Sequence, residues 1–442
     1  MQGSPAPHRF MPAGPLTGRI AVPGDKSISH RAVILGGLAV GETKVTGLLE
    51  AEDVLATVAA MRALGSQIEK NGDTWHVHGT GTGALLQPEG ALEMGNSGTA
   101  ARLLAGVVSS HAITACFTGD ASLSRRPMGR VIEPLSLMGA SFSASPGGTL
   151  PFMLTGISPA VPIDYQLPVP SAQVKSAVLL AALNTPGITT VTEAVPTRDH
   201  TERMLRAAGA DLTVEEVGAG RIIRVRGEAE LRPLTLEVPG DPSSAAFLIV
   251  AALLVEGSDL LIENVGMNPT RAGLVDVLRQ MGGSIEKLNP REVGGEPVAD
   301  LRVRHSRLSG ADMDAALAPS MIDEFPALFV AAALADGRTM TRGLDELRVK
   351  ESDRLAAMAA ALTLAGARVE ETGDGLVIEG TGGEKLRGTA EHEAVATLLD
   401  HRIAMSMAVA GLASRNGVLV DDMRPVATSF PNFVELLAGA AK

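Results

Sequence analysis

The feature that most constrains this fold is an internal repeat, in which one half of the sequence resembles the other. The segment Val22–Ser27 (VPGDKS) matches Val238–Ser243 (VPGDPS), and an apolar stretch of helical length follows each copy. Farther along, Leu64–Glu69 (LGSQIE) matches Met281–Glu286 (MGGSIE). These matches predict two similar halves that join near residues 237–239.

Weaker copies divide each half further. Units recur roughly every 70 to 85 residues, which is longer than the ~20–50 residues of a solenoid repeat. The weaker copies begin near Gly95, Pro170, Glu324 and Asp400. In each unit an apolar core helix precedes a second, amphipathic one such as Asp53–Leu64, with strand patterns between and after them. We therefore predict an α/β fold of six strand–helix–strand–helix–strand units, three in each half. One continuous α/β domain is the alternative.

Composition excludes several classes of function. Lys plus Arg number 38 against 50 Asp plus Glu, and a net charge of -12 lacks the basic surface that general nucleic-acid binding needs. Aromatic residues, at 2%, are too few for stacking on single strands. The one cysteine, Cys116, excludes a disulfide framework and a cysteine-built metal site. No apolar run reaches the roughly 18 residues of a membrane helix. Because the segment 1–17 lacks the apolar region of a secretory signal, we expect a cytoplasmic protein.

The most informative motif is Gly24–Arg31 (GDKSISHR). A glycine turn opens a helix there, and the free backbone N–H groups at a helix start attract anions. Lys26 and Arg31 add cationic donors, whereas the matching copy, Asp241–Ser244 (DPSS), has a cap and a proline but no cation. The motif indicates an anion site added to a structural repeat, although a well-capped helix with solvated charges shows the same pattern.

A second helix start and a loop in the same half carry related residues. Gly95–Thr99 (GNSGT) has two glycines that let a backbone approach a ligand closely. Arg125 and Arg126 lie in a predicted loop and can grip a carboxylate or a phosphate. A tight turn and a solvated loop explain these residues equally well.

A third helix start is Pro170–Lys175 (PSAQVK). Ser171 is a good N-cap. We expect Gln173 and Lys175 to be able to reach a ligand at this helix start. Capping alone remains the alternative.

The second half carries acids beside its cations. In the segment KESDR, Lys350 and Arg354 lie four apart, which predicts that they share one helical face with Glu351 beside them. This set suits acid–base chemistry on an anionic substrate, or a surface salt-bridge cluster. Asp400–Arg402 (DHR) precedes another apolar helix. Asp323–Glu324 also precedes one, where carboxylates can be simple partners of the helix dipole.

Other patterns predict no function. His76 and His78 alternate on a predicted strand without a third ligand nearby, so we expect no metal site. The chain has neither a dinucleotide fingerprint nor a phosphate loop.

Five of the six units, however, open with polar or cationic groups at a helix start. If the halves faced each other, these groups would converge on one cleft suited to a small, strongly anionic ligand.

Together these motifs resemble those of the 5-enolpyruvylshikimate-3-phosphate synthases, over about Leu16–Leu437. The motifs that carry the resemblance are Gly24–Arg31, Gly95–Arg102, Arg126–Pro127, Ser171–Gln173, Lys350–Arg354 and Asp400–Arg402. Four details resemble the bacterial class II subgroup, namely Ser27, Ser171–Lys175, Arg198–Glu202 (RDHTE) and Asn268–Arg271 (NPTR).

The resemblance implies the enolpyruvyl transferase fold, with two similar domains of three βαβαββ units each and an active site in the cleft between them. Residues 22–237 would form one domain, and residues 238–442, completed by the leader 1–21, the other. It also implies transfer of the enolpyruvyl group of phosphoenolpyruvate to the 5-hydroxyl of shikimate-3-phosphate through a tetrahedral intermediate, with release of phosphate. This reaction belongs to the shikimate pathway of aromatic amino acid biosynthesis. We expect no metal, no organic cofactor, no nucleic-acid or membrane partner, and a monomer.

The same resemblance implies roles for the matching residues. Asp323 would accept the proton of the attacking hydroxyl, and Glu351 with Lys350 would handle the proton at the methylene carbon, with Lys26 completing the catalytic set. The residues implied to bind phosphoenolpyruvate are Lys26, Gly98, Arg126, Gln173, Lys350, Arg354 and Arg402. Those implied to bind shikimate-3-phosphate are Lys26, Ser27, Arg31, Ser171, Ala172, Gln173, Arg198, Asp323 and Lys350.

Two positions depart from the family pattern. Some class II members carry Ala where this chain has Gly98, and the missing methyl widens the phosphoenolpyruvate pocket, so tolerance of the inhibitor glyphosate stays open. Thr428 stands where other members place a Lys, which puts one cation of that pocket in doubt.

Three other functions are weighed against this one. UDP-N-acetylglucosamine enolpyruvyl transferase shares the fold, but its loop cysteine is replaced here by Ala121, and Cys116 lies five residues earlier. RNA 3′-terminal phosphate cyclase would need a basic surface. A non-catalytic anion-binding protein would keep the cations without needing Asp323 and Glu351, and both acids are present.

Overall fold

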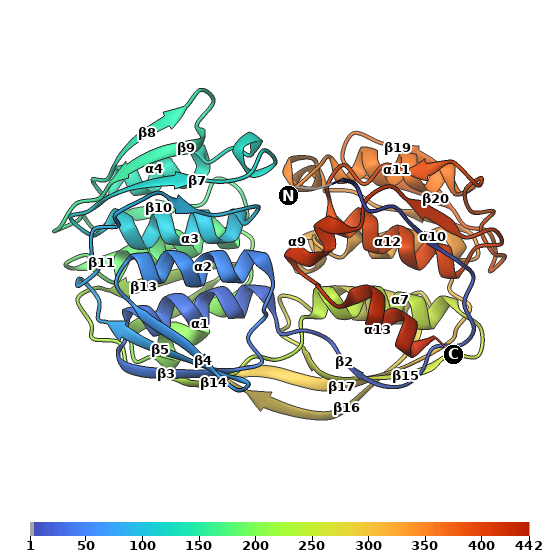
Figure 1. Cartoon of the computed structure of the whole chain (residues 1–442), viewed down its shortest axis with the longest axis horizontal. Coiled ribbons are helices and arrows are strands. Elements are labelled where there is room, and N and C mark those ends of the chain that lie inside the picture. Colours follow the sequence, from blue (N-terminus) through green and yellow to red (C-terminus); the bar gives the residue numbers. More distant parts are fainter. Residues whose placement is uncertain (1–3, 442) are drawn as a thin grey trace. The chain divides into compact units, whose positions relative to one another are not determined.

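The structure, a computed structural model, describes residues 4–441 (Figure 1). In this range the strands form six small sheets of three or four strands each. The chain divides into two compact halves. The N-terminal half comprises Gly24–Val238 and the hairpin turn Val293–Glu296. The C-terminal half comprises the chain up to Pro23, Pro239–Glu292 and the chain from Pro297 onward.

The first unit of the N-terminal half shows the repeated pattern. Its elements are α1 (Lys26–Leu38), β3 (Val40–Thr46), α2 (Glu52–Ala63), β4 (Gln67–Asn71) and β5 (Thr74–Thr80). A strand from the end of this half, β14 (Thr235–Glu237), pairs in parallel with β3. Strand β5 pairs antiparallel with β3 and β4, so the order is β14-β3-β5-β4.

The other two units of this half repeat the pattern with their own leading strand. The second contains β6 (Leu92–Glu93), α3 (Gly98–Ser109), β7 (Thr114–Thr118), α4 (Gly129–Leu137), β8 (Ser141–Ser145) and β9 (Thr149–Thr155). The third contains β10 (Asp164–Gln166), α5 (Ala172–Ala182), β11 (Ile188–Glu193), α6 (His200–Ala207), β12 (Asp211–Val217) and β13 (Gly220–Arg226). In both, the leading strand is parallel to its neighbour and the later pairings are antiparallel.

The C-terminal half has three corresponding units. The fourth contains α7 (Pro242–Leu254), β15 (Asp259–Gly266), α8 (Gly273–Gln280), β16 (Ser284–Val293) and β17 (Glu296–Arg304). The fifth contains η2 (Ala315–Leu317), α9 (Ala318–Met321), α10 (Phe325–Leu334), β18 (Arg338–Met340), η3 (Asp345–Val349), α11 (Arg354–Leu364), β19 (Arg368–Glu371) and β20 (Leu376–Glu379). The sixth contains β21 (Ala394–Val395), α12 (His401–Leu412), β22 (Val418–Val420), η4 (Arg424–Thr428) and α13 (Phe433–Ala440).

The start of the chain supplies two strands to this C-terminal half. Strand β1 (His8–Phe10) pairs antiparallel with β22 of the sixth unit. Strand β2 (Thr17–Ala21) pairs in parallel with β15 of the fourth unit, just as β14 does with β3. The leader is therefore an integral part of two sheets.

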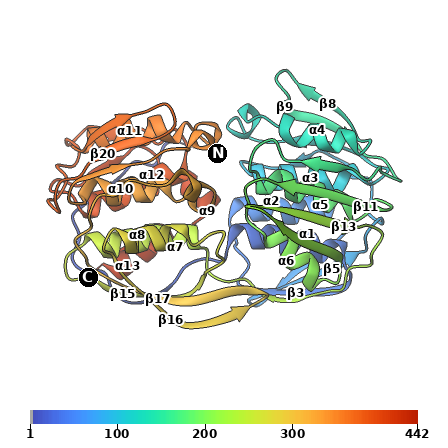
Figure 2. The same cartoon turned by 180° about the vertical axis from the view of Figure 1, so that it is seen from behind.

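The core of each half is formed by the first helix of each unit. Helices α10 and α12 are buried along their whole length, and α1, α3, α5 and α7 nearly so. Figures 1 and 2 show these helices lying inside each half, with the sheets around them. The predicted core helices are confirmed. The amphipathic pattern predicted for the second helix is seen in α2, where Val54, Val58 and Met61 are buried and Leu55 is 40% exposed. No helix in residues 4–441 has both the length and the apolar character needed to cross a membrane.

The two strongest sequence matches mark equivalent places in the fold. Asp25 and Asp241 are the N-caps of α1 and α7, and each carboxylate accepts a backbone N–H of its helix's first turn. The second match covers the turns after α2 and α8, where Gly65 and Gly282 have φ of +106° and +97°. A side chain is disfavoured at such angles, which explains why both copies keep glycine.

A glycine also packs the end of the last strand against the end of the core helix in four units, at Gly79, Gly156, Gly227 and Gly380. A Cβ atom at Gly227 would lie 1.9 Å from the carbonyl oxygen of Thr185 and 2.4 Å from that of Ala182. These oxygens belong to backbone and cannot move aside as a side chain could. The strand end thus approaches the helix only because a methyl group is missing.

We predict that Gly227→Ala lowers the free energy of unfolding by about 3 kcal/mol, because backbone must shift to relieve the overlap. Gly373→Ala is the control, since nothing lies within 4 Å of its added Cβ. Urea unfolding followed by circular dichroism measures both. Equal stability of the two variants would contradict this account of the packing.

Candidate active site

The predicted site residues form two groups, one in each half. In the N-terminal half they lie at or near the starts of α1, α3 and α5, in the loop before α4 and, for Arg198, just before α6. Each of these helices begins with a capping side chain: Asp25 accepts from the Ile28 N–H at 2.9 Å, Ser97 from Ala100 at 3.1 Å and Ser171 from Val174 at 3.3 Å. The caps fix the helix starts, whose remaining N–H groups favour anions. Lys26, Ser27, Ala172 and Gln173 lie in or beside these first turns, all partly exposed.

Lys26 is held by a buried acid that sequence reasoning did not assign to the site. Its Nζ lies 3.1 Å from Oδ2 of Asp53, which is 6% exposed at the start of α2. Because 27 residues separate the pair, no local spacing rule links them. The only signal in the sequence was an acidic residue in the first turn of the second helix. The contact fixes where the Lys26 ammonium lies.

Gly98 lies where two arginine side chains come close together. The Arg102 guanidinium donates to the carbonyl of Gly98 at 3.1 Å and to Oε1 of Gln173 at 3.0 Å. Gln173 in turn donates to the Thr99 hydroxyl at 2.9 Å. A Cβ atom at Gly98 would lie 2.6 Å from Nη1 of Arg102 and 3.4 Å from Nη1 of Arg126. Glycine is therefore what lets both guanidinium groups approach this helix start.

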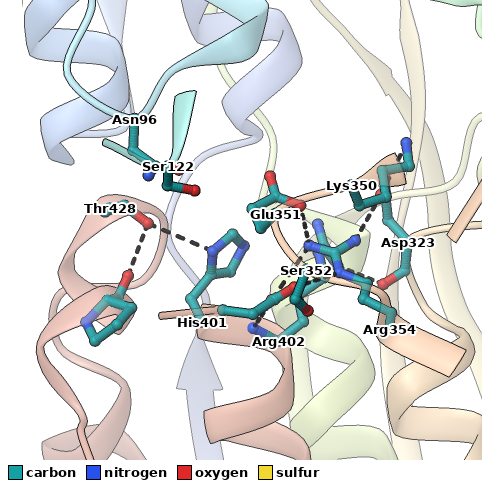
Figure 3. Close-up of polar contacts among 12 residues, drawn as sticks. Asn96, Ser122, Asp323, Lys350, Glu351, Ser352, Arg354, His401, Arg402 and Thr428 are labelled. Atoms are coloured by element: carbon teal, nitrogen blue, oxygen red, sulfur yellow. Dashed lines mark hydrogen bonds and ion pairs between the residues drawn. The ribbon is translucent and has the colours of Figure 1, made fainter. Parts of the chain in front are cut away.

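Arg126 is buried, at 7% exposure, whereas its neighbour Arg125 is exposed. The Arg126 guanidinium donates to Oδ1 of Asn96 at 2.5 Å and to the Ser122 hydroxyl at 3.2 Å. The two acceptors, Asn96 and Ser122, are labelled in Figure 3. Of the two adjacent arginines, only Arg126 is built into the group around α3.

Arg31 is more deeply enclosed than the other predicted ligands. Its side chain donates to the hydroxyls of Thr201 and Ser176, both at 2.7 Å, and to the carbonyl of Ser27 at 2.8 Å. Burial lowers the pKa of Arg31 to about 10, although Glu202 counteracts it, so the group is still a cation at neutral pH. The charge of Arg198 also lowers the pKa of Arg31, so these two of the predicted shikimate-3-phosphate ligands influence each other electrostatically.

The expectation that Lys175 reaches a ligand is wrong. Its side chain is fully buried, with Nζ 2.9 Å from Glu193 and 2.7 Å from Glu202. The helical spacing turns Lys175 into the core, away from the partly exposed first turn that carries Gln173. Lys175 is a structural ion-pair partner that joins α5 to β11 and α6.

The group in the C-terminal half is organised around Arg354 (Figure 3). Its guanidinium is 1% exposed and contacts three carboxylates, at 2.8 Å from Asp400, 2.5 Å from Glu351 and 3.3 Å from Asp323. Burial alone would lower the pKa of Arg354, but Asp400, Glu351 and Asp323 raise it well above its ordinary value. Arg354 is therefore a permanent cation that gathers both predicted catalytic acids.

Lys350 and Arg354 do not share a helical face, contrary to the prediction from their spacing. Lys350 follows the short helix η3, and α11 begins only at Arg354, with Asp353 as its N-cap. The two cations nevertheless converge, because Lys350 Nζ lies 3.6 Å from the same Asp323 Oδ1 that Arg354 contacts. A turn, rather than helical periodicity, brings them together.

Arg402 joins this group from the first turn of α12. Asp400, the N-cap of that helix, accepts the backbone N–H of Arg402 at 2.9 Å. The Arg402 side chain donates from Nη1 to the backbone carbonyl of Asp323 at 2.7 Å. Arg354, Lys350 and Arg402 thus all contact Asp323.

Thr428 supplies no cation at the position where a lysine was expected from the family pattern. Its hydroxyl donates to the carbonyl of Pro425 at 2.7 Å and lies 3.5 Å from Nδ1 of His401, as Figure 3 shows. The side chain is buried within the turn of η4. Any cation replacing that lysine must come from another position.

The fold is shared with solved structures of other proteins. The structure of EPSP synthase from Acinetobacter baumannii superposes with a TM-score of 0.86 at 45% identity, covering 98% of both chains. The enolpyruvyl transferase NikO from Streptomyces tendae, at 20% identity, shares the fold with a TM-score of 0.76 over 100% of this chain and 98% of its own. The chain therefore has the enolpyruvyl transferase fold.

Sequence comparison narrows this class to one family. The family model described as EPSP synthase (3-phosphoshikimate 1-carboxyvinyltransferase) matches residues 11–437. The 3-phosphoshikimate 1-carboxyvinyltransferase of Novosphingobium aromaticivorans is 72% identical over 438 residues, 99% of each chain. That of Sphingopyxis alaskensis is 66% identical over 98% of each chain. The chain belongs to the EPSP synthase family.

We predict that Asp53→Asn, which removes the charge opposite Lys26, lowers kcat/KM for both substrates about tenfold through misplacement of the ammonium. The control is Glu69→Gln, an equal change of charge at an exposed position on β4. Steady-state kinetics with each substrate varied in turn measures the effect. Unchanged kinetics in the folded Asp53 variant would show that Lys26 needs no anchor.

We predict that Gly98→Ala raises KM for phosphoenolpyruvate about tenfold and changes KM for shikimate-3-phosphate less than about twofold, because the methyl displaces the Arg102 guanidinium from Gln173. Gly90→Ala, at an exposed position where nothing meets the added Cβ, serves as the control. Initial rates at varied concentrations of each substrate test this. A rise in both constants alike would argue against a local effect on phosphoenolpyruvate.

Proposed function

We propose that this protein transfers the enolpyruvyl group of phosphoenolpyruvate to the 5-hydroxyl of shikimate-3-phosphate with the residues described above. The observation that carries the assignment is the contact of three cationic residues, Lys350, Arg354 and Arg402, with Asp323, while Arg354 also contacts Glu351. Anionic substrates need the cations, and proton transfers need the acids. Membership of the EPSP synthase family supports the same reaction.

The chemistry assigns each acid a different proton. Protonation of the methylene carbon of phosphoenolpyruvate, by Glu351 with Lys350 beside it, makes the neighbouring carbon electrophilic. Asp323 takes the proton of the 5-hydroxyl as its oxygen attacks that carbon. The resulting tetrahedral intermediate then loses phosphate, which carries away the proton that Asp323 accepted. A proton of the new methyl group returns to Glu351, which regenerates the double bond and restores both acids.

The cations would stabilise the charge that moves during this sequence. In the C-terminal half, Lys350, Arg354 and Arg402 are proposed to hold phosphoenolpyruvate and the departing phosphate. In the N-terminal half, Lys26, Gly98, Arg126 and Gln173 are proposed as further phosphoenolpyruvate ligands. The helix starts at Ser27 and at Ser171–Ala172, together with Arg31 and Arg198, are proposed to bind shikimate-3-phosphate.

The histidine next to Lys26 and Arg31 does not add to this positive charge. Burial lowers the pKa of His30 well below its ordinary value, and the charges of Lys26 and Arg31 lower it further. His30 is therefore neutral at neutral pH, and its Nδ1 lies 2.7 Å from the Thr57 hydroxyl. The cationic character of this helix comes from Lys26 and Arg31 alone among its residues.

We further propose that the protein acts in the cytoplasm as a monomer without a metal or organic cofactor. The mass in solution, which is 45.5 kDa for one chain, tests the monomer. No group of three His, Cys, Asp or Glu side chains within residues 4–441 is arranged to hold a metal ion.

The reaction is tested by following phosphate release from phosphoenolpyruvate with shikimate-3-phosphate or UDP-N-acetylglucosamine as acceptor. Release that requires shikimate-3-phosphate is the expected result. Release with the sugar nucleotide alone would overturn the proposed acceptor. Transfer to UDP-N-acetylglucosamine is not expected, because the sister family's loop cysteine is replaced here by Ala121. The cysteine of this chain, Cys116, lies instead on β7.

We predict that Asp323→Ala lowers kcat about a thousandfold, because it removes the proton acceptor from the attacking hydroxyl. Shikimate-3-phosphate is expected to bind within about threefold of its wild-type affinity, since other side chains hold its phosphate. Single-turnover kinetics and isothermal titration calorimetry measure the two quantities. Near-normal turnover by the variant would mean that another group accepts the proton.

A further inference from the structure

Glu324 is a buried acid next to the proposed base, and the family resemblance gives it no role, whereas the sequence alone indicates no more than a partner of the helix dipole. It is 1% exposed and directly precedes α10. A carboxylate at a helix start can serve as a cap, but the Glu324 side chain makes no capping hydrogen bond to its helix. A buried carboxylate needs other partners to offset its desolvation. Those partners therefore indicate what Glu324 does.

One side of the carboxylate is anchored to the start of α7. The Ser243 hydroxyl donates a short hydrogen bond to Oε1 of Glu324. The same hydroxyl accepts from Nη2 of Arg271 at 2.7 Å, and that nitrogen also lies 3.2 Å from Asp241, the N-cap of α7. Nη2 of Arg271 lies 3.8 Å from Oε1 of Glu324. Because Arg271 and Ser243 are themselves buried, this side of the carboxylate is fixed.

The other side of the carboxylate faces Arg402. Nη1 of Arg402 lies 3.9 Å from Oε1 of Glu324 and donates to the carbonyl of Asp323 at 2.7 Å. Within residues 4–441, Oε2 of Glu324 has no hydrogen-bond partner, so Oε1 makes all these contacts. Oε1 is thus shared between a fixed guanidinium, that of Arg271, and one proposed to bind substrate, that of Arg402.

We propose that Glu324 is a positioning residue for the reaction. Its carboxylate, anchored by Ser243 and Arg271, holds the Arg402 guanidinium against the backbone of Asp323. One buried charge thereby sets the place of a phosphoenolpyruvate-binding cation relative to the proton acceptor. The kinetic part of this inference rests on the proposed function, whereas the placement of Arg402 can be tested without it.

The test is Glu324→Gln, which keeps the size and an acceptor oxygen but removes the charge. KM for phosphoenolpyruvate should rise about tenfold, while KM for shikimate-3-phosphate changes less than about twofold. Glu393→Gln, at an exposed position, is the charge-matched control. The positioning role would be overturned if neither KM changed. It would also be overturned if both KM values rose together and the melting temperature fell.

Two further measurements keep the proposal testable if the first variant folds poorly or the wild type lacks the proposed activity. Ser243→Ala retains every charge and removes only the anchor, so it should raise KM for phosphoenolpyruvate about threefold without a matching effect on shikimate-3-phosphate. No change in that variant would contradict the anchor. A crystal structure of Glu324→Gln should show Arg402 displaced from the Asp323 carbonyl. Retention of that contact would overturn the proposal whichever reaction the protein catalyses.

Discussion

The C-terminal part of the site depends on the burial of one guanidinium, that of Arg354. Alone, a charge so enclosed would be very costly, and here three carboxylates offset its desolvation. The dependence is mutual, because Asp323 and Glu351 are drawn together by the cation that they neutralise. Removing one partner of a buried ion pair typically costs about 3–5 kcal/mol. The geometry of the acids is therefore part of the stability of this half and is set without a substrate.

The N-terminal half also holds its cations in fixed positions, but with different partners. Its ion pair between Lys26 and Asp53 is partly buried, while Arg31 relies on neutral hydroxyls and a backbone carbonyl. The repeat shows which residues distinguish a helix start in the proposed site from its structural counterpart. The starts of α1 and α7 have the same aspartate cap, but Lys26 and Arg31 have no counterpart in α7, where Ser243, together with Arg271 from the segment just before α8, instead anchors Glu324.

The helix starts and the core helices could be predicted from the sequence, because caps and apolar stretches are local patterns and the repeat shows each of them twice. The VPGD copies marked the starts of α1 and α7, and the apolar stretches marked the core helices. Features that depend on distant partners could not be predicted. Asp53 lies 27 residues from Lys26, and Glu324 lies 81 residues from Ser243. The prediction that Lys350 and Arg354 share a helical face fails because a bend separates Lys350 from the start of α11. The prediction that Lys175 reaches a ligand fails because only part of the first turn of α5 is exposed, and Lys175 lies on the buried side.

The central proposal is that the preformed cationic group around Arg354 binds phosphoenolpyruvate, with Asp323 accepting the proton of the 5-hydroxyl. The most direct measurement is a crystal structure of the protein with shikimate-3-phosphate and an unreactive analogue of phosphoenolpyruvate. We predict that the analogue contacts Lys350, Arg354 and Arg402, with the 5-hydroxyl of shikimate-3-phosphate within hydrogen-bonding distance of Asp323. An analogue that contacts none of these three cations, or a 5-hydroxyl far from Asp323, would contradict the proposal.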